Sequence, residues 1–315
     1  MNTEESVKWL AQVHSGKCYP KRFDEINKEL PYFHIFKDAL GKYDIACFNY
    51  KGHDNEDRMP YMAGYFKQVI FPYVTTNISG YYNIELHDSY TYLKNGKDYK
   101  DCLTFAKFKT DKLIPLLPDV YFINNWGDQV IKDPTPWEDK LSKICWFGTT
   151  TGSRIPTENN RIKTCLWALN KRDICDFYVT KVAQMDPAKV LLDIPEFKQI
   201  YRQGASQEEQ MKYRYHLTLD GNTSGWNVWE YKTNSLVFKQ KSNEMLWYYP
   251  LMKDKVHFVN VDTDNMESMY QYYQNNAKEA NLIIKNANQF AANLFKPDIC
   301  QLYTVALFDS ISDNK

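Results

Sequence analysis

Residues 136–154 read PWEDKLSKICWFGTTTGSR, and residues 213–239 read YRYHLTLDGNTSGWNVWEYKTNSLVFK. Each stretch begins with a short apolar strand, continues into a turn rich in Gly, Thr, Ser and Asn, and then enters a helix. Such turns present backbone N–H groups and hydroxyls, which bind phosphate oxygens, and the N-terminus of the following helix favours the same negative charge. The two stretches therefore predict an anion cradle made of two strand–turn–helix units.

The region from residue 136 onward alternates between strand and helix. Strands are expected at 143–147, 174–179, 213–219, 236–238 and 256–261. Helices are expected at 159–170, 226–234 and 265–291. This alternation is typical of a parallel, Rossmann-like sheet.

The first 135 residues have a less regular pattern. Helices are expected near 6–13 and 23–30, and strands at 81–86 and 116–125. Ligands of open α/β sheets bind beyond the carboxyl ends of the strands. The polar residues 124–128 are therefore a candidate rim of an active site.

The length of the chain predicts more than one compact unit. With 315 residues it is too long for one ordinary core and suits two lobes. We expect an N-terminal lobe over 1–135, a C-terminal lobe over 136–290, and a helix within 291–315 that packs back on the N-terminal lobe.

Composition narrows the classes of ligand. Lys plus Arg and Asp plus Glu are equal at 39 each, so no net charge attracts nucleic acid or an anionic membrane. Aromatic residues make up 16% of the chain. Aromatic faces stack on the apolar C–H patches of sugars, although a compositional bias toward Tyr, Asn, Lys and Ile gives the same content. Both interpretations stay open.

Cysteine and histidine spacing predicts no metal site. The seven cysteines are scattered without a CxxC pair, and the six histidines form no HExxH motif. Residues 1–30 lack the apolar core of a signal peptide, no later run approaches 18 apolar residues, and the C-terminal SISDNK is not an ER-retention signal. We therefore expect a cytoplasmic protein without a membrane span.

The two turn motifs resemble the signature blocks of a known enzyme family. WFGTTTG at 146–152 and DGNTSGWN at 220–227 resemble glycosyltransferase family 90, which holds protein O-glucosyl- and O-xylosyltransferases, fungal capsule-associated proteins and bacterial lipopolysaccharide-modifying enzymes. SLVFKQKSNEMLWYYPLMKDKVHFVNV at 235–261 continues the similarity, which runs from about Leu117 to Tyr303.

The resemblance implies a GT-B type α/β fold, with two Rossmann-like lobes and a central cleft. It further implies an inverting, metal-independent transfer of xylose or glucose from a UDP-sugar to a hydroxyl of a glycan or protein acceptor. The donor would bind the C-terminal lobe and the acceptor the N-terminal lobe. No cofactor is implied beyond the donor substrate, and no nucleic-acid partner.

The same resemblance assigns donor contacts in this sequence. They are Gly148, Thr149, Thr150, Thr151, Arg154, Arg161, Asn222, Thr223, Ser224, Gly225, Trp226, Asn227, Ser235 and Lys239. The chain departs from the family at two positions, where Phe147 and Asn227 stand in place of arginines that grip the donor diphosphate. We expect Arg161 to supply most of the missing charge, with the nearer Arg154 as a substitute.

The catalytic base implied by the resemblance is Asp128, at the end of LPDVYFINNWGD (117–128). A carboxylate suits this task because it needs only hydrogen-bond reach to the acceptor hydroxyl, and burial can raise its pKa toward neutrality. Asp119 in the same motif is the second candidate.

A further acidic motif has two interpretations. Asp262 and Asp264 follow a predicted strand, as do the metal-binding carboxylates of GT-A transferases, whose divalent ion prefers oxygen ligands. The same residues precede a predicted helix and suit its N-terminal cap, which is the interpretation we favour. Metal-dependent transfer and a catalytically inactive sugar-binding relative remain the alternatives.

Overall fold

The structure, a computed structural model, describes residues 2–15, 20–53, 55–87, 102–111, 114–119, 122, 129–222 and 225–312, with only the backbone of 225, 226 and 312. The chain forms two compact units. Unit 1 comprises residues 1–129, 243–251 and 293–315, and unit 2 comprises 130–242 and 252–292. Within the described ranges, no helix combines the length and the apolar character that a membrane crossing requires.

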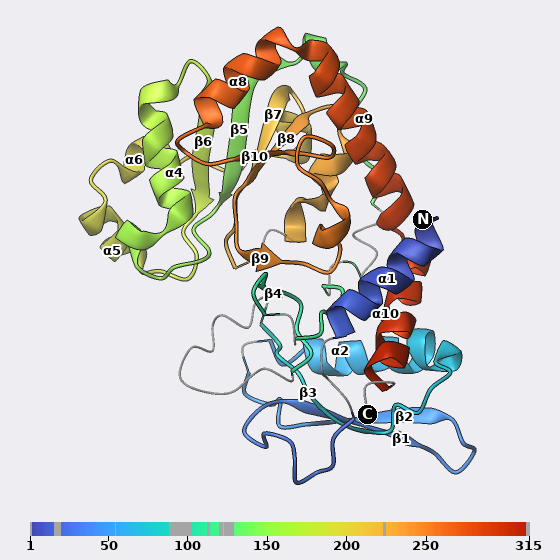
Figure 1. Cartoon of the computed structure of the whole chain (residues 1–315). Helices are drawn as coiled ribbons and strands as arrows, with labels where there is room; N and C mark the ends of the chain where they lie inside the picture. The colour runs from blue at the N-terminus through green and yellow to red at the C-terminus, as the bar shows by residue number, and fades with distance from the viewer. Residues whose placement is uncertain are drawn as a thin grey trace. The chain divides into compact units, whose positions relative to one another are not determined.

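Unit 2 is built on a parallel sheet of five strands in the order β10-β8-β7-β5-β6 (Figure 1). The strands are β5 (Leu141–Thr149), β6 (Cys175–Lys181), β7 (Tyr213–Thr218), β8 (Leu236–Gln240) and β10 (Val259–Val261). Each overlaps a strand expected from the sequence, and the mixed α/β class is confirmed. The middle of several of these strands is a continuous apolar run, such as ICW in β5 and LVF in β8, which is typical of strands buried on both faces of a parallel sheet.

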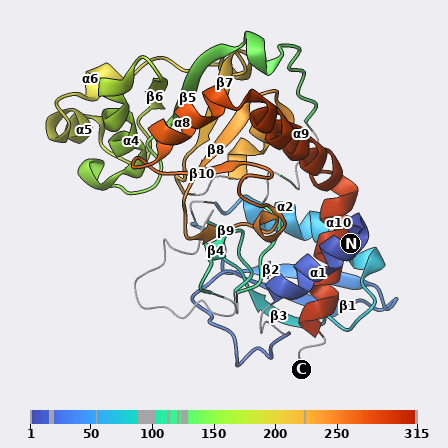
Figure 2. The same ribbon diagram turned by 45° about the horizontal axis from the view of Figure 1, so that its top comes forward.

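Helices cover the sheet of unit 2, and α8 and α9 cross one of its faces in both views (Figure 1, Figure 2). The helices are α4 (Asn160–Ala168), α5 (Pro187–Asp193), α6 (Phe197–Ile200), α7 (Gln207–Gln210), α8 (Met266–Asn275) and α9 (Ala277–Leu294). Short 3-10 segments are η5 (Trp137–Asp139), η6 (Pro156–Glu158), η7 (Leu169–Lys171) and η8 (Gly225–Lys232). Ile144, Trp146 and Phe177 of the sheet pack against Ile162 of α4 and Tyr273 of α8 in one buried core.

Two helix predictions for unit 2 need correction. The single helix expected at 265–291 is two helices, because Asn276 leaves the helical region with φ −125° and ψ 52°. The helix expected at 226–234 is the tighter 3-10 helix η8.

Unit 1 contains an antiparallel sheet of three strands in the order β2-β1-β3. Its strands are β1 (Tyr32–Lys37), β2 (Tyr43–Phe48) and β3 (Gly80–Asn83), and a separate pair is formed by β4 (Lys107–Phe108) and β9 (Glu244–Met245). Its helices are α1 (Thr3–Ser15), α2 (Arg58–Tyr65), the π-helix η1 (Phe66–Ile70), the 3-10 helices η2 (Phe71–Tyr73) and η9 (Tyr249–Leu251), and α10 (Pro297–Ser312). Helix α10 packs along α1.

The sequence prediction for this unit was less accurate. The helix expected at 6–13 is confirmed within α1, but 23–30 forms hydrogen-bonded turns because the Asn27 side chain accepts the N–H of Glu29 and competes with helix formation. The strand expected at 81–86 ends at Asn83 in β3. That expected at 116–125 shows only a bridge from Leu116 to Thr104, and residues 120, 121 and 123–125 lie outside the described residues.

The N-terminal lobe was expected to be Rossmann-like, which is wrong for its described strands. Residues 38–42 connect β1 to β2 directly, and so short a link permits only an antiparallel hairpin. Among the described residues of unit 1, parallel pairing occurs only as isolated bridges, Ile84 with Leu103 and Thr104 with Leu116.

Candidate donor-binding site

Two turns meet at the carboxyl edge of the sheet of unit 2. One follows β5 and the other follows β7, and β5 and β7 are neighbouring parallel strands, so their ends lie side by side. We call residues 149–153 and 219–222 together the cradle. Carboxyl edges of parallel sheets are where ligands of α/β proteins bind.

Arg161 of α4 ties the two turns together. Its Nη1 donates to the carbonyl oxygen of Thr149 (3.1 Å) and to Oγ1 of Thr151 (2.7 Å). On the other turn, Nη2 donates to the carbonyl of Leu219 (3.0 Å) and Nε to that of Asp220 (3.2 Å). One guanidinium therefore fixes the spacing of the two halves of the cradle.

Asn159, which the sequence analysis did not single out, holds the first turn. Its Nδ2 donates to the carbonyls of Thr150 (2.9 Å) and Ser153 (3.0 Å), and its Oδ1 accepts the N–H of Ile162 (3.1 Å). The last contact makes Asn159 the N-cap of α4. An Asn directly before the apolar periodicity of α4 was the available sequence signal.

Three side-chain amides also accept hydrogen bonds from the backbone of the cradle. The N–H of Gly152 donates to Oδ1 of Asn222 and to Oε1 of Gln184, both at 3.2 Å. Oε1 of Gln240, at the end of β8, accepts the N–H of Asp220 (3.3 Å). No sequence signal marked Gln184 or Gln240, because their partners come from other strands.

Close packing inside the cradle requires glycine at position 221. A Cβ on Gly221 would lie 2.4 Å from Oγ1 of Thr151 and 2.5 Å from Cζ of Arg161. Gly152 has φ +115°, a conformation that favours glycine. Both glycines are therefore needed for the two turns to approach each other.

The cradle keeps backbone donors unused. Within the described part of the chain, no acceptor is found for the N–H groups of Thr151, Ser153 and Gly221. Arg154 is exposed directly beyond the first turn and makes no hydrogen bond or ion pair with any described residue. Two turns with unpaired amides, the first followed in the chain by the exposed Arg154, form an environment that suits an anion.

Several predicted donor residues have structural contacts instead. A Cβ on Gly148 would lie 2.5 Å from the ring of Trp146, so this glycine makes room for the tryptophan. Thr150 is fully buried, and its hydroxyl both donates to the carbonyl of Ala183 and accepts the N–H of Ala183, each at 2.8 Å. Ser235 lies before β8, at the amino edge of the sheet, where its hydroxyl donates to the carbonyl of Tyr213 (2.7 Å).

Other predicted donor residues lie closer to the cradle or cannot be placed. Lys239 is buried in β8 opposite Thr218, near the carboxyl edge. Asn227 is half-buried in η8, which Gly225 begins. Thr223, Ser224 and the side chain of Trp226 lie outside the described residues.

Asp262 has the contacts expected of a helix cap. Its Oδ1 accepts the N–H groups of Asp264 (3.0 Å) and Asn265 (3.1 Å) just before α8, and its Oδ2 lies 2.6 Å from Nζ of Lys241. The hydrogen bond from Lys241 holds the pKa of Asp262 below its usual value. Both carboxylate oxygens are therefore already used within the protein.

Comparison with known proteins connects this site to an enzyme family. The family model described as glycosyl transferase family 90 matches residues 129–313. The chain belongs to glycosyl transferase family 90. The matched residues include every strand of the unit 2 sheet and both halves of the cradle.

Three known proteins are similar to part of this chain. O-glucosyltransferase LpsA of Dichelobacter nodosus is 26% identical over 179 residues, which are 56% of this chain and 50% of that protein. Protein O-glucosyltransferase 1 of Mus musculus is 26% identical over 171 residues, 53% of this chain and 41% of that protein. Uncharacterized protein 035R of Invertebrate iridescent virus 3 is 24% identical over 166 residues, 49% of this chain and 15% of that protein. The chain thus spans half or less of the length of these relatives.

Phe147, which departs from the expected family 90 motif, lies in a cluster of rings and arginines. Its ring stacks with that of Tyr178 at 5.9 Å between centroids. The guanidinium carbon of Arg202 lies 5.1 Å from the centroid of Phe147 and 5.4 Å from that of Tyr178. Nη2 of Arg202 also lies 2.7 Å from the carboxylate of Glu209. A cation therefore remains beside this position, although it comes from a different segment.

Glu230 of η8 is an ionisable group buried in this family 90 unit. The hydroxyl of Thr218 in β7 donates to its carboxylate at 2.5 Å. Burial raises the pKa of Glu230 to about 8, so the side chain is mostly protonated at neutral pH. This neutral contact joins η8, which carries Gly225 and Asn227, to the strand that ends in the cradle.

The predicted catalytic base of the family 90 reaction cannot be placed. Asp128 lies outside the described residues. Asp119, the second candidate, is buried in unit 1 with 2% of its surface exposed, and its carbonyl oxygen accepts the N–H of Phe122 (2.9 Å).

Proposed function

We propose that this protein is a glycosyltransferase that moves a sugar from a UDP-sugar to a hydroxyl of a glycan or protein acceptor. The observation that carries the proposal is the cradle of unpaired N–H groups on two adjacent turns at the carboxyl edge of a family 90 sheet. Amide donors in such a place suit the oxygens of a diphosphate.

Contacts in the cradle suggest separate tasks for the two arginines. Arg161 donates its hydrogen bonds to the two turns and adds positive charge close to their amides. Arg154 is exposed and unpaired among the described residues, so it is available for a charge-assisted hydrogen bond to the diphosphate. We therefore assign direct contact to Arg154 and the ordering of the site to Arg161.

For the chemistry we propose a single displacement with inversion. The acceptor oxygen forms a bond to the anomeric carbon while the bond from that carbon to the UDP oxygen breaks. Asp128 takes the proton of the acceptor hydroxyl, and the amides of the cradle stabilise the negative charge that grows on the leaving UDP. In this scheme unit 2 holds the donor.

Glucose is the first choice of sugar, because two of the relatives are named O-glucosyltransferases, and xylose is the second. We propose that no metal ion takes part, since the carboxylate of Asp262 is engaged by Lys241 and by the amides at the start of α8. Metal-dependent transfer through Asp262 and Asp264 is the alternative, and it predicts that EDTA abolishes activity and manganese restores it.

The proposal is tested with UDP and a panel of UDP- and GDP-sugars. Isothermal titration should show that Arg154→Met weakens UDP binding about 10- to 150-fold, the usual effect of losing one charge-assisted hydrogen bond. The exposed Arg22, in unit 1, gives the matched control Arg22→Met, which should bind UDP like the wild type. Normal UDP affinity in Arg154→Met would contradict the assigned contact.

A catalytically inactive relative is the second candidate, motivated by Phe147 and Asn227 at the positions of expected arginines. Such a protein would bind a UDP-sugar but release no UDP, with or without acceptor. Slow hydrolysis of one donor in the panel, lost in Asp128→Asn, would favour the enzyme.

A further inference from the structure

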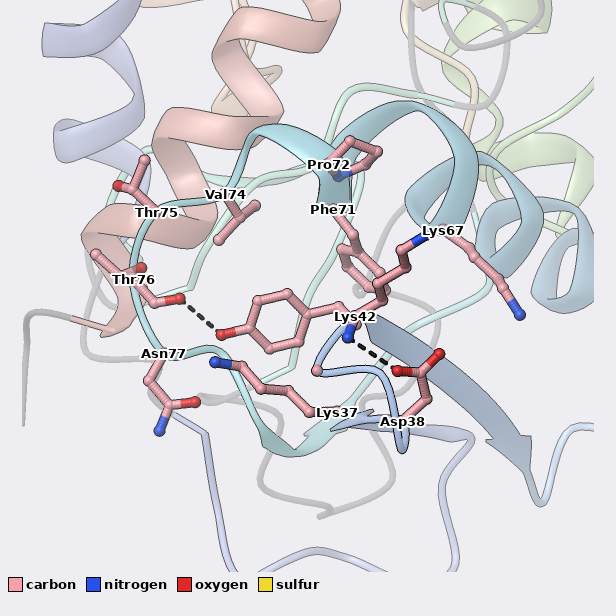
Figure 3. A pocket seen from close by; sticks show the side chains of 12 residues that line it. Lys37, Asp38, Lys42, Lys67, Phe71, Pro72, Val74, Thr75, Thr76 and Asn77 are labelled. Carbon is pink, nitrogen blue, oxygen red and sulfur yellow. Dashed lines mark hydrogen bonds between the residues drawn. The ribbon is translucent and has the colours of Figure 1, made fainter.

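Unit 1 contains a cavity of about 810 Å³ between the β1–β2 hairpin and the segment that follows η1 (Figure 3). Its lining comes from residues 37–43 around the hairpin turn, from Lys67 of η1, and from residues 71–77. This volume is in the range of sites that bind small molecules. No residue of the cradle contributes to it.

The cavity carries an excess of positive charge. Lys37, Lys42 and Lys67 line it, and Asp38 is the one carboxylate among the lining residues. Nζ of Lys67 lies 2.9 Å from the carboxylate of Asp44. In the described residues, no acidic group forms an ion pair with Lys37 or Lys42. Two ammonium groups are thus available to an anion.

Hydrogen bonds hold one wall of the cavity, the hairpin turn, in place. Oδ1 of Asp38 accepts the N–H groups of Leu40 and Lys42, each at 2.9 Å, so this carboxylate is occupied by the turn. Gly41 completes the turn with φ +74°. Oδ1 of Asp38 therefore holds the turn, and the lining keeps three lysines against this one carboxylate.

The opposite wall is fixed as well. The carbonyl of Thr76 accepts the hydroxyl of Tyr43 at 2.8 Å. The N–H groups of Thr75 and Thr76 donate to Oδ1 of Asp309 in α10, at 3.0 and 3.1 Å. A site built before its ligand arrives loses less entropy on binding.

Aromatic and apolar side chains supply a second type of surface. The rings of Tyr43 and Phe71 meet edge to face at 5.9 Å, next to Val74 and Pro72. Nζ of Lys37 lies over the ring of Tyr43, 5.1 Å from its centroid. Because an ammonium group covers this ring, a flat base has little room to stack. Sugar C–H groups need only a smaller apolar patch.

We propose that this cavity binds an acidic saccharide, a sugar that carries a carboxylate or a phosphate ester. The anionic group meets Lys37 and Lys42, and the apolar face of the sugar packs beside Phe71 and Val74. Hydroxyls of the sugar bond to the side chain of Asn77 and to nearby carbonyl groups. The proposal concerns binding alone and holds whether or not the protein transfers sugar.

The test is isothermal titration of the full chain with matched probes. A disaccharide with one uronic acid and a hexose phosphate should both bind. The same disaccharide with its carboxylate reduced to an alcohol should bind at least about 10-fold more weakly, because it cannot accept charge-assisted hydrogen bonds. Lys37→Gln and Lys42→Gln should each weaken the acidic probes by about 10-fold or more. Lys51→Gln, an exposed lysine outside the lining, should change nothing.

Four results would overturn the proposal. The first is equal affinity for the acidic and the neutral disaccharide, and the second is inorganic phosphate that binds as tightly as the hexose phosphate. The third is binding of UMP that the Lys42→Gln substitution abolishes, and the fourth is that no probe binds. The third would make the cavity a nucleotide site. Thermal melting of each variant verifies folding. The side chain of Lys42 makes no hydrogen bond or ion pair with any described residue, so its variant remains informative if Lys37→Gln is destabilised.

Discussion

Replacing Arg161 with Met should release the two turns of the cradle while the sheet stays folded. The substitution removes hydrogen bonds to the carbonyls of Thr149, Leu219 and Asp220 and to the hydroxyl of Thr151. A hydrogen bond from a charged donor contributes about 1.5–3 kcal/mol net, but bonds from one side chain do not add, and half-buried carbonyls can regain water. We therefore expect a loss of about 2–4 kcal/mol in the free energy of unfolding.

For a unit of about 150 residues, this loss corresponds to a fall in melting temperature of roughly 5–15 °C. Arg154→Met is the matched control, and because Arg154 is exposed it should change stability by less than about 0.5 kcal/mol. Arg161→Lys keeps the positive charge but cannot span carbonyls on both turns, so it should also be destabilised. Calorimetry and UDP titration on all three variants measure the two roles separately.

The reasoning would be refuted if Arg161→Met lost UDP affinity while unfolding like the wild type. In that case the guanidinium would contact the sugar donor, and the two turns would be stable without its hydrogen bonds. It would equally fail if Arg161→Lys restored full stability, because charge alone would then explain the role of Arg161.

Four further predictions concern stability and turnover. Gly221→Ala should cost about 1–3 kcal/mol in chemical denaturation, because its Cβ would lie 2.5 Å from Cζ of Arg161, and unchanged stability would show that the cradle can widen. Glu230→Gln should change the pH dependence of stability: in the wild type the contribution of Glu230 is greatest below pH 4.5 and falls by about 1.4 kcal/mol per pH unit up to its pKa of about 8, roughly 3 kcal/mol by pH 7. The variant should lack this slope in denaturation at pH 4.5 to 8, and a parallel slope would mean that Glu230 is not the group responsible. Asp128→Asn should bind UDP normally but turn over about 100- to 10,000-fold more slowly, and full turnover would move the base to another carboxylate. Asp262→Ala should lose about 0.5–2 kcal/mol with activity retained in EDTA, whereas lost activity at unchanged stability would support the metal-dependent alternative.

The accuracy of the sequence predictions differs between the units for a physical reason. In unit 2, ICW (144–146) and LVF (236–238) are apolar runs buried in a parallel sheet, so hydrophobicity alone locates the strands. In unit 1, YFHIFK and YDIACF mix aromatic and polar residues in a hairpin, and their pairing depends on a turn built by Asp38. Helices α6 and α7 have four residues each, too few to show a helical period.

The candidate site shows the same limit. Gly, Thr and Asn residues at the ends of two strands predicted the cradle, because such residues are needed wherever backbone must approach a ligand. The role of Arg161 in joining the two turns could not be read from the chain, since two of its acceptors lie 58 and 59 residues away on the second turn. The contribution of Gln184, which follows a third strand, was hidden for the same reason.

The direction of the peptide groups explains how the cradle comes to present its N–H groups. In a trans peptide the C=O and the following N–H point in opposite directions, and the described residues contain no cis peptide. Asn159 draws in the carbonyl of Thr150, so the N–H of Thr151 faces the other way. Arg161 draws in the carbonyl of Asp220, so the N–H of Gly221 does the same. These two side chains therefore set the polarity of the site. The backbone donors of the cradle are oriented by residues that need not touch a ligand, so the anion site that we propose does not depend on the two arginines expected at Phe147 and Asn227.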